Sequence, residues 1–241
     1  MFPAIGKKPI SEVKAQAVLN LLRKVEGRGA NDQAHRLRQR IDAIFALAIG
    51  EGLAETNPAA MIGKALAPVV MGRYPALRTI GEARRLIEQS EGAPGNPITK
   101  LASRFLAVTA ARSEAVRYAE WGEFTDGLWR IPGAHMKGQR GQRSDPNFEF
   151  IIPLPPQAQA ILDAVRPLTE KALVFGGARD PRKPMSDSTI SAIYRRLPEF
   201  ASRHVPHGWR STFSTIMNEW AMEGGKAGDR EVIDLMLAHV R

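Results

Sequence analysis

Three side chains in two short segments of this chain are of the types that bind a phosphodiester. Arg112 follows a Thr-Ala-Ala run, and His207 and Arg210 share the motif His-Gly-Trp-Arg. A guanidinium is a planar fork of donors that matches two phosphate oxygens. A spacing of three residues brings His207 and Arg210 to one face of a helix, and Pro206 is suited to the first turn of that helix. Backbone N–H groups at a helix start attract anions, so we interpret the motif as part of an anion-binding site.

Each of these residues alone also has an ordinary structural explanation. An arginine late in an apolar helix can extend its stem along the surface and keep its charge in water. A His-x-x-Arg pair can belong to a solvated helix face. His239 comes shortly after the mostly apolar segment 232–237, and a histidine at a helix C-terminus interacts favourably with the helix dipole. The functional interpretation therefore depends on the three segments occurring together and in this order.

The composition excludes several kinds of site and favours an anionic partner. The chain has 241 residues and a formal net charge of +9, which favours nucleic acid as the partner. It contains no cysteine, so disulfides, thiolate metal sites and cysteine nucleophiles are excluded. No apolar run reaches the roughly 20 residues needed to span a bilayer, and the N-terminus does not have the pattern of a signal peptide. We therefore expect a cytoplasmic protein with no membrane segment.

Residues 1–65 are predicted to be helical, because apolar residues recur there at three- and four-residue steps. Ser11 is the expected cap of the first helix, and Asn31 or Asp32 the cap of the second. Asn57, which precedes a proline, is expected to open a short third helix. The second helix also carries a basic cluster, formed by His35, Arg36, Arg38 and Arg40.

The remaining sequence predicts a linker and then a mixed region. Two prolines interrupt residues 66–79, and a new helical unit begins near Thr79. One long helix is predicted over 100–119, and the apolar pattern then becomes strand-like at 127–132 and 148–154. The loop between these strands is basic and contains Lys137, Arg140 and Arg143. Further helices are predicted at about 155–166, 188–202, 207–220 and 229–238. The sequence therefore predicts a mainly α fold with a small antiparallel β-sheet.

Together these segments resemble the catalytic domain of tyrosine recombinases, the phage integrase family. The three catalytic boxes of that family are similar to residues 106–115, 206–212 and 235–240. Met136-Lys137 resembles the family's sheet lysine, which lies in a hairpin. Residues 2–10 and 36–40 resemble the core-binding helices, particularly those of prophage integrases.

The resemblance implies a domain organisation and a set of partners. It implies a partial helical core-binding domain at residues 1–65, a linker at 66–79 and an integrase-type catalytic domain at 80–241. The implied partner is double-stranded DNA at attachment sites, bound by a homotetramer of the full-length parent. A bacterial protein of this family would be cytoplasmic and associated with the nucleoid. Neither a cofactor nor a metal is implied.

The implied reaction is site-specific recombination, such as prophage integration or excision, by metal-free transesterification through a 3′-phosphotyrosyl intermediate. Arg112 and Arg210 would hold the nonbridging oxygens of the scissile phosphate, and His207 would assist as base or hydrogen-bond donor. Lys137 would protonate the leaving 5′ oxygen, and His239 would donate a further hydrogen bond. The candidates for DNA contact are His35, Arg36, Arg38, Arg40, Arg140 and Arg143.

The chain departs from the family pattern at two places. Family members usually carry an acidic residue three positions after the first arginine, where this chain has Ala115, with Glu114 one position earlier. The nucleophilic tyrosine is expected shortly after His239, beyond the last residue of this sequence. The tyrosines present are Tyr74, Tyr118 and Tyr194, and none matches that box. We therefore expect the chain as given to bind DNA without cutting it and to be mostly monomeric.

Three other interpretations remain open at this point. The chain could be a non-catalytic DNA-binding remnant of an integrase. It could be a topoisomerase-like enzyme with the same chemistry and no site preference, which a plasmid relaxation assay would separate. It could also be a helical scaffold with a basic surface, which failure to bind duplex DNA at low salt would favour.

Overall fold

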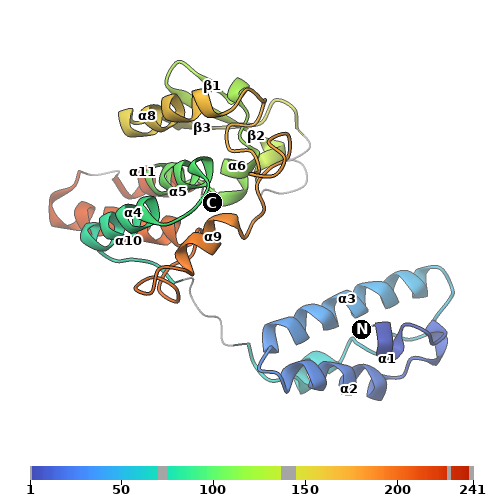
Figure 1. Cartoon of the computed structure of the whole chain (residues 1–241). Coiled ribbons are helices and arrows are strands. Elements are labelled where there is room, and N and C mark those ends of the chain that lie inside the picture. The colour runs from blue at the N-terminus through green and yellow to red at the C-terminus, as the bar shows by residue number, and fades with distance from the viewer. Residues whose placement is uncertain (1, 70–74, 137–144, 227–228, 239–241) are drawn as a thin grey trace. The chain divides into compact units, whose positions relative to one another are not determined.

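The computed structural model describes residues 2–69, 75–136, 145–226 and 229–238 (Figure 1). The chain divides into two compact units, residues 1–72 and 73–241. Both units are mainly α-helical, and the second also contains a three-stranded antiparallel sheet. The predicted fold class, mainly α with a small antiparallel sheet, is therefore confirmed. None of the helices in the described ranges is long and apolar enough to cross a bilayer.

The first unit is built on a pair of packed helices, α2 (Ala15–Glu26) and α3 (Asn31–Gly50). Three short segments complete it: α1 (Phe2–Ile5) and the 3-10 helices η1 (Ile10–Glu12) and η2 (Ile62–Ala65). The core includes Val18, Leu22, Ile41 and Phe45. The predicted caps of α3 lie inside it: Asn31 and Asp32 are its first two residues, and Ala30 precedes them.

Two predicted helix starts in the first unit are wrong. Ser11 lies within η1, and α2 begins only after Lys14. Asn57 does not open a helix, and residues 58–61 form turns instead. Its side-chain oxygen accepts a hydrogen bond from the Ala59 amide at 2.9 Å, as in an Asx turn. Its side-chain nitrogen donates to Asp42 Oδ1 at 2.8 Å, which ties this turn to α3.

The second unit begins with two capped helices. α4 (Ile80–Gly92) starts where the sequence predicts, because Thr79 Oγ1 accepts a hydrogen bond from the Glu82 amide at 3.2 Å. α5 (Pro97–Thr109) is capped by the side chain of Asn96, with proline at its first position. The buried face of α5 contributes to the core of the second unit.

The single long helix predicted over 100–119 is wrong, because the chain breaks after α5. Thr109 Oγ1 donates to the Phe105 carbonyl at 2.8 Å, and Ala110 adopts the left-handed conformation with φ of 49°. Such a residue ends a helix. A new helix, α6 (Ser113–Tyr118), then begins with Arg112 as its N-cap residue. Arg112 therefore lies at a helix start, not late in a helix as predicted.

The sheet has the order β1-β2-β3, formed by β1 (Phe124–Thr125), β2 (Leu128–Pro132) and β3 (Glu149–Pro153). The antiparallel pair β2–β3 confirms the two predicted strands, whereas β1 was not predicted. Trp129 pairs with Ile152 across the sheet, and both are buried. The Trp129 ring also contacts Phe105 of α5 edge-on, at 5.3 Å between ring centroids.

Four helices follow the sheet: α8 (Pro156–Val165), α9 (Thr189–Tyr194), α10 (Gly208–Gly224) and α11 (Asp229–Met236). α8 ends in the short 3-10 helix η5 (Arg166–Leu168). The helix predicted over 188–202 is much shorter than expected. Pro198 explains this, because proline disfavours helical geometry at the residue before it and lacks an N–H donor. The chain from 195 to 203 forms tight turns instead.

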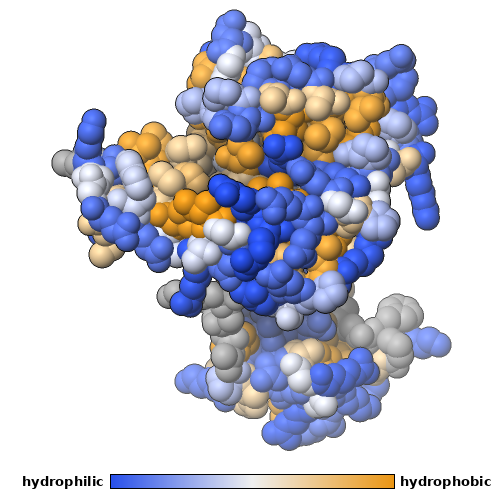
Figure 2. Space-filling view, turned by 60° about the vertical axis from the view of Figure 1, so that its left-hand side comes forward, coloured by the Kyte–Doolittle hydropathy of each residue, from blue (hydrophilic) through white to orange (hydrophobic). Residues whose placement is uncertain are grey.

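Not every large hydrophobic side chain is buried in these cores. Leu47 and Met61 are exposed in the first unit, and Met222 and Leu235 in the second. Figure 2 shows hydrophobic side chains among hydrophilic ones on the face that it presents. Some exposed apolar surface is normal for a folded protein, so these residues alone do not indicate a binding site.

Candidate functional site

Arg210 lies in the first turn of α10 and is buried, with only 7% of its surface exposed. Its Nη1 donates to the carbonyl of Ala110 at 3.1 Å, and its Nη2 donates to the carbonyl of Leu237. These carbonyls lie at the C-terminal ends of α5 and α11, where helices leave acceptors without partners. Burial and the nearby charge of Arg112 lower the pKa of Arg210 to about 10. The guanidinium is therefore held in place by backbone acceptors.

Arg112 lies near Arg210, two residues after Ala110 and at the start of α6. It is half-buried at the N-cap position of α6, and burial lowers its pKa. Arg112 and Arg210 both line one small pocket, which we call the arginine pocket. Its walls are Ala111, Arg112, Ala115, Ile131, Met136, Phe150, Ile152, Arg210 and Ala238. Across the described ranges, neither arginine forms an ion pair with a carboxylate, so a bound anion would offset their mutual repulsion.

His207 is exposed and directly precedes α10, with helical backbone angles. The predicted His-x-x-Arg spacing therefore spans the start of a helix, as expected. The neighbouring glycine is required by close packing. A Cβ atom on Gly208 would lie 2.3 Å from the carbonyl oxygen of Pro75 and 3.0 Å from the His204 ring. Only glycine lets the chain begin α10 against these atoms.

Two predicted members of the site, Lys137 and His239, lie outside the described residues, as do Arg140 and Arg143. Their neighbours in sequence are informative. Met136 and Ala238, which directly precede Lys137 and His239, both line the arginine pocket. Ala115, at the position where an acidic residue was expected, also lines it. The three boxes and the hairpin therefore lead to one place in the second unit.

The basic cluster of α3 is differently arranged. Arg36 pairs with Asp32 one turn earlier at 2.8 Å, and Arg40 is exposed. His35 Nε2 lies 2.9 Å from the Ala67 carbonyl, and Arg38 Nη1 donates to the Ala59 carbonyl at 3.3 Å. His35 and Arg38 thus hold α3 against the residues that follow it, while Arg36 and Arg40 remain available to solvent. Contact of this cluster with DNA stays a prediction.

One buried polar cluster beside the hairpin was missed by sequence reasoning. Glu123 accepts a hydrogen bond from Trp129 Nε1 at 2.8 Å, and its other oxygen lies 2.9 Å from His135 Nδ1. Burial raises the pKa of Glu123. This cluster fixes His135, which directly precedes Met136 of the arginine pocket. No sequence pattern reveals it, because the contact depends on the path of the chain around the sheet.

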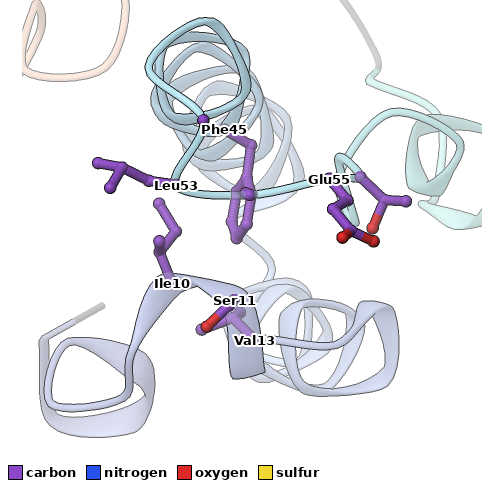
Figure 3. Close-up of a pocket in the computed structure, with 9 residues that line it drawn as sticks. Ile10, Ser11, Val13, Phe45, Leu53 and Glu55 are labelled. Carbon is purple, nitrogen blue, oxygen red and sulfur yellow. The ribbon is translucent and has the colours of Figure 1, made fainter.

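The first unit contains a pocket of a different character, with a volume of about 450 Å³ (Figure 3). Phe45 of α3 points into it, facing Ile10 and Leu53 (Figure 3). Ser11 and Glu55 also line it, and no lysine or arginine does. It therefore lacks the charge needed to bind a phosphate. In the part of the chain that the structure describes, no group of three or more His, Asp or Glu side chains could hold a metal ion.

Comparisons with known proteins agree with the overall fold. A family model described as the phage integrase central domain matches residues 1–65. The prophage integrase IntZ of Escherichia coli K12 is 35% identical over 243 residues, covering 100% of this chain and 56% of the relative. The integrase of Enterobacteria phage P4 is 30% identical over 240 residues, covering 96% of this chain and 54% of the relative. The chain therefore spans about half the length of these relatives.

Among solved structures, a lambda integrase tetramer bound to a Holliday junction has a similar fold, with a TM-score of 0.66 at 17% identity. The match covers 99% of this chain and 68% of the lambda chain. The structural similarity covers nearly the whole chain. The residues of the arginine pocket lie either in the three boxes or in the segment of β2, β3 and Met136. The matched central domain and the prophage relatives support a tyrosine recombinase of the phage integrase type.

Proposed function

We propose that this chain supplies the DNA-binding core and the phosphate-binding groups of a site-specific DNA recombinase. The observation that carries the proposal is the convergence of Arg112 and Arg210 on one pocket without a carboxylate partner in the described residues. Two desolvated guanidinium groups are strong hydrogen-bond donors to a phosphodiester. Their positions are set by the fold, so they are preorganised for the charge that develops during transfer.

The proposed reaction exchanges one phosphodiester for another. A tyrosine oxygen attacks the scissile phosphorus, the bond to the 5′ oxygen breaks, and a 3′-phosphotyrosyl link forms. Arg112 and Arg210 hold the nonbridging oxygens throughout, and His207 accepts or donates a proton beside them. Lys137 supplies the proton that the leaving 5′ oxygen requires, and His239 donates a further hydrogen bond. Because the number of phosphodiester bonds is conserved, attack by another 5′ hydroxyl reverses the step and joins new partners.

The nucleophile of this reaction is proposed to come from outside residues 1–241. Tyr194 is only 1% exposed, and its hydroxyl bonds to Ser103 and Trp209. Tyr118 lies at the end of α6, with its ring against His135. Tyr74 lies outside the described residues. We therefore expect residues 1–241 alone to bind duplex DNA without forming a covalent link to it.

The proposed partner is duplex DNA, bound by several copies of the full protein. The net charge of +9 favours a polyanion, and Arg36 and Arg40 offer cations on the surface of α3. Arg140 and Arg143 would add contacts from the basic loop. We propose a homotetramer on DNA for the full protein, in analogy with the lambda integrase tetramer.

The decisive experiment traps the covalent intermediate in a tyrosine-containing protein that includes residues 1–241. In a duplex nicked close to the cleavage site, the short strand that carries the new 5′ hydroxyl dissociates after attack, so the phosphotyrosyl complex accumulates. Arg210→Lys keeps the charge but not the fork, and we expect it to lower the rate of capture by about 100-fold or more. Duplex affinity should stay within a few-fold. Arg84→Ala removes an exposed charge from α4 and is the matched control. Undiminished capture by the Arg210 variant would reject the assignment.

A further inference from the structure

The first turns of α10 present two pairs of residues to different surroundings. His207 and Arg210 form one pair, and Trp209 and Thr212 form the other. Each pair has a spacing of three, and a shift of two positions rotates a side chain by roughly 200° about the axis. The two pairs therefore point to nearly opposite sides of the helix. Whatever fixes the rotation of the Trp209 side also fixes the direction of His207 and Arg210.

A buried chain of hydrogen bonds holds the Trp209 side. Trp209 Nε1 donates to the Tyr194 hydroxyl at 2.8 Å, and that hydroxyl lies 2.7 Å from Ser103 Oγ. An indole N–H is only a donor, so the Tyr194 oxygen accepts from it and can donate its own hydrogen to Ser103. None of the three residues is more than 4% exposed. These bonds connect α10 to α9 and α5 in a region from which water is excluded.

The neighbouring contacts make this arrangement specific. The His204 ring packs edge-on against the Trp209 ring, at 4.6 Å between centroids. Thr212 Oγ1 accepts a hydrogen bond from the Leu77 amide at 3.0 Å, which gives the same side of α10 a second polar contact. Burial raises the pKa of Tyr194 to about 12, so its hydroxyl keeps its proton at physiological pH. The Tyr194 hydroxyl is therefore a constant partner for Trp209.

We propose that Tyr194 is a positioning residue whose buried hydroxyl, acting through Trp209, fixes the rotation of α10. This rotation directs Arg210 to the arginine pocket and sets the direction of His207 at the helix start. Apolar packing is not directional, and a helix held only by apolar contacts can repack with a small rotation. A buried donor cannot leave its acceptor without remaining unpaired, so this bond selects one rotation. The inference rests on the proposed anion-binding function of the pocket.

α5 contacts both the Tyr194 hydroxyl and the Arg210 guanidinium. Ser103 lies within α5, and Ala110, whose carbonyl accepts from Arg210, is its C-cap residue. A rotation of α10 by about 10° moves an atom roughly 6 Å from the helix axis by about 1 Å. That displacement would misalign Arg210 with its acceptor. A misplacement of about 1 Å in a catalytic group can reduce a rate by about 100-fold.

The test compares Tyr194→Phe with Ser103→Ala in the full chain. The first variant removes the acceptor of the Trp209 bond, and the second removes only the other bond of the same hydroxyl. Nitrogen-15 NMR measures how fast the guanidinium hydrogens of Arg210 exchange with solvent. Titration with inorganic phosphate, followed by the imidazole signals of His207, measures the affinity of the pocket. Amide protection in α8 and the melting temperature report general stability.

We expect Tyr194→Phe to accelerate Arg210 exchange and to weaken phosphate binding by about tenfold. Ser103→Ala should stay within about twofold of the wild type in both measurements, and α8 should keep its protection in both variants. Tyr194→Phe within twofold of the wild type would overturn the proposal. Equal losses in both variants that follow their melting temperatures would also overturn it. A wild-type chain that does not respond to phosphate contradicts the anion site, and Arg210 exchange then still decides the role of Tyr194.

Discussion

Arginines occur in two contrasting settings in this protein. On α3, Arg36 and Arg40 are exposed, and Arg36 is paired with an aspartate one turn away. At the arginine pocket, Arg112 and Arg210 lie close enough to lower the pKa of Arg210, and Arg210 is bonded to carbonyl groups at helix ends. On α3, the arginine side chains are surrounded by water, and salt screens their charges. At the arginine pocket, the guanidinium groups are partly removed from water, where electrostatic interactions are stronger. Charge alone therefore does not distinguish a DNA-attracting surface from a reaction site, but burial and bonding partners do.

The largest expected effect separates the two settings directly. Arg112→Ala in the tyrosine-containing protein should lower covalent capture by about 10²- to 10³-fold, because it removes preorganised donors to the phosphate. Arg40→Ala, a matched loss of one charge from α3, should leave the capture rate at saturating DNA nearly unchanged. Single-turnover kinetics on a nicked duplex measures both. If both variants lost the same factor in capture rate, the arginine pocket and α3 would not differ in their role in the reaction.

The second prediction concerns how the unfolding free energy of the second unit depends on pH. Burial lowers the pKa of His204 to about 4, below its unfolded value of 6.5. As pH falls, His204 is therefore protonated in the unfolded chain before it is protonated in the folded chain. The stability that the neutral ring contributes is complete above about pH 6.5 and is lost between about pH 6.5 and pH 4. The difference corresponds to about 3 kcal/mol of unfolding free energy.

All four tryptophans lie in residues 73–241, so tryptophan fluorescence during urea unfolding reads the second unit alone. His204→Leu should remove most of the pH dependence between 6.5 and 4. A variant that keeps the full dependence would show that another group is responsible.

A smaller effect is expected at the contact between Thr212 and the start of the second unit. Thr212→Val keeps the shape of the side chain but leaves the buried Leu77 amide without its acceptor. We expect a loss of about 2 kcal/mol in unfolding free energy, because an unpaired buried donor loses its hydration without compensation. Thr212→Ser retains the hydroxyl and should recover most of that loss. Chemical denaturation of the three proteins decides this, and a serine variant as unstable as the valine variant would contradict it.

The smallest expected effect lies on α3. Replacing both Arg36 and Arg40 with alanine should reduce the slope of log affinity against log salt by about 1.8, as expected for two phosphate contacts. The loss of affinity should shrink as salt rises. Fluorescence anisotropy with a labelled duplex measures the slope, and Arg84→Ala on α4 is the control for an unrelated exposed charge. An unchanged slope would remove α3 from the proposed DNA surface.

The fold class that the sequence predicts is confirmed, and the residues proposed for the site come from residue types at fixed spacing. The three-residue spacing of His207 and Arg210 indicates one face of a helix. The strands at 128–132 and 149–153 are indicated by a change from a helical to a strand-like apolar pattern. The position of Arg112 could not be predicted correctly. Its geometry depends on a left-handed alanine, and alanine is a residue that normally favours continuing a helix.

Other features escaped prediction because they arise only from tertiary contacts. The Glu123–His135 contact and the bond between Trp209 and Tyr194 join residues that share no periodic pattern. The early end of α9 at Tyr194 was in principle readable from Pro198, whose effect on the preceding residue is local. Sequence patterns therefore gave the residues proposed for the site, whereas the contacts that hold those residues in place required the three-dimensional structure.

The carbonyl bonds of Arg210 also bear on how a gene of this family would decay. Arg210 completes the C-terminal ends of two helices, whereas His207 is exposed at the start of α10. A copy that no longer recombines DNA, but is still selected as a folded DNA-binding protein, would lose only the constraints that the reaction imposes. Arg210 would continue to be selected for stability. The presence of this arginine in a relative is thus evidence of a retained fold and does not by itself indicate a retained reaction.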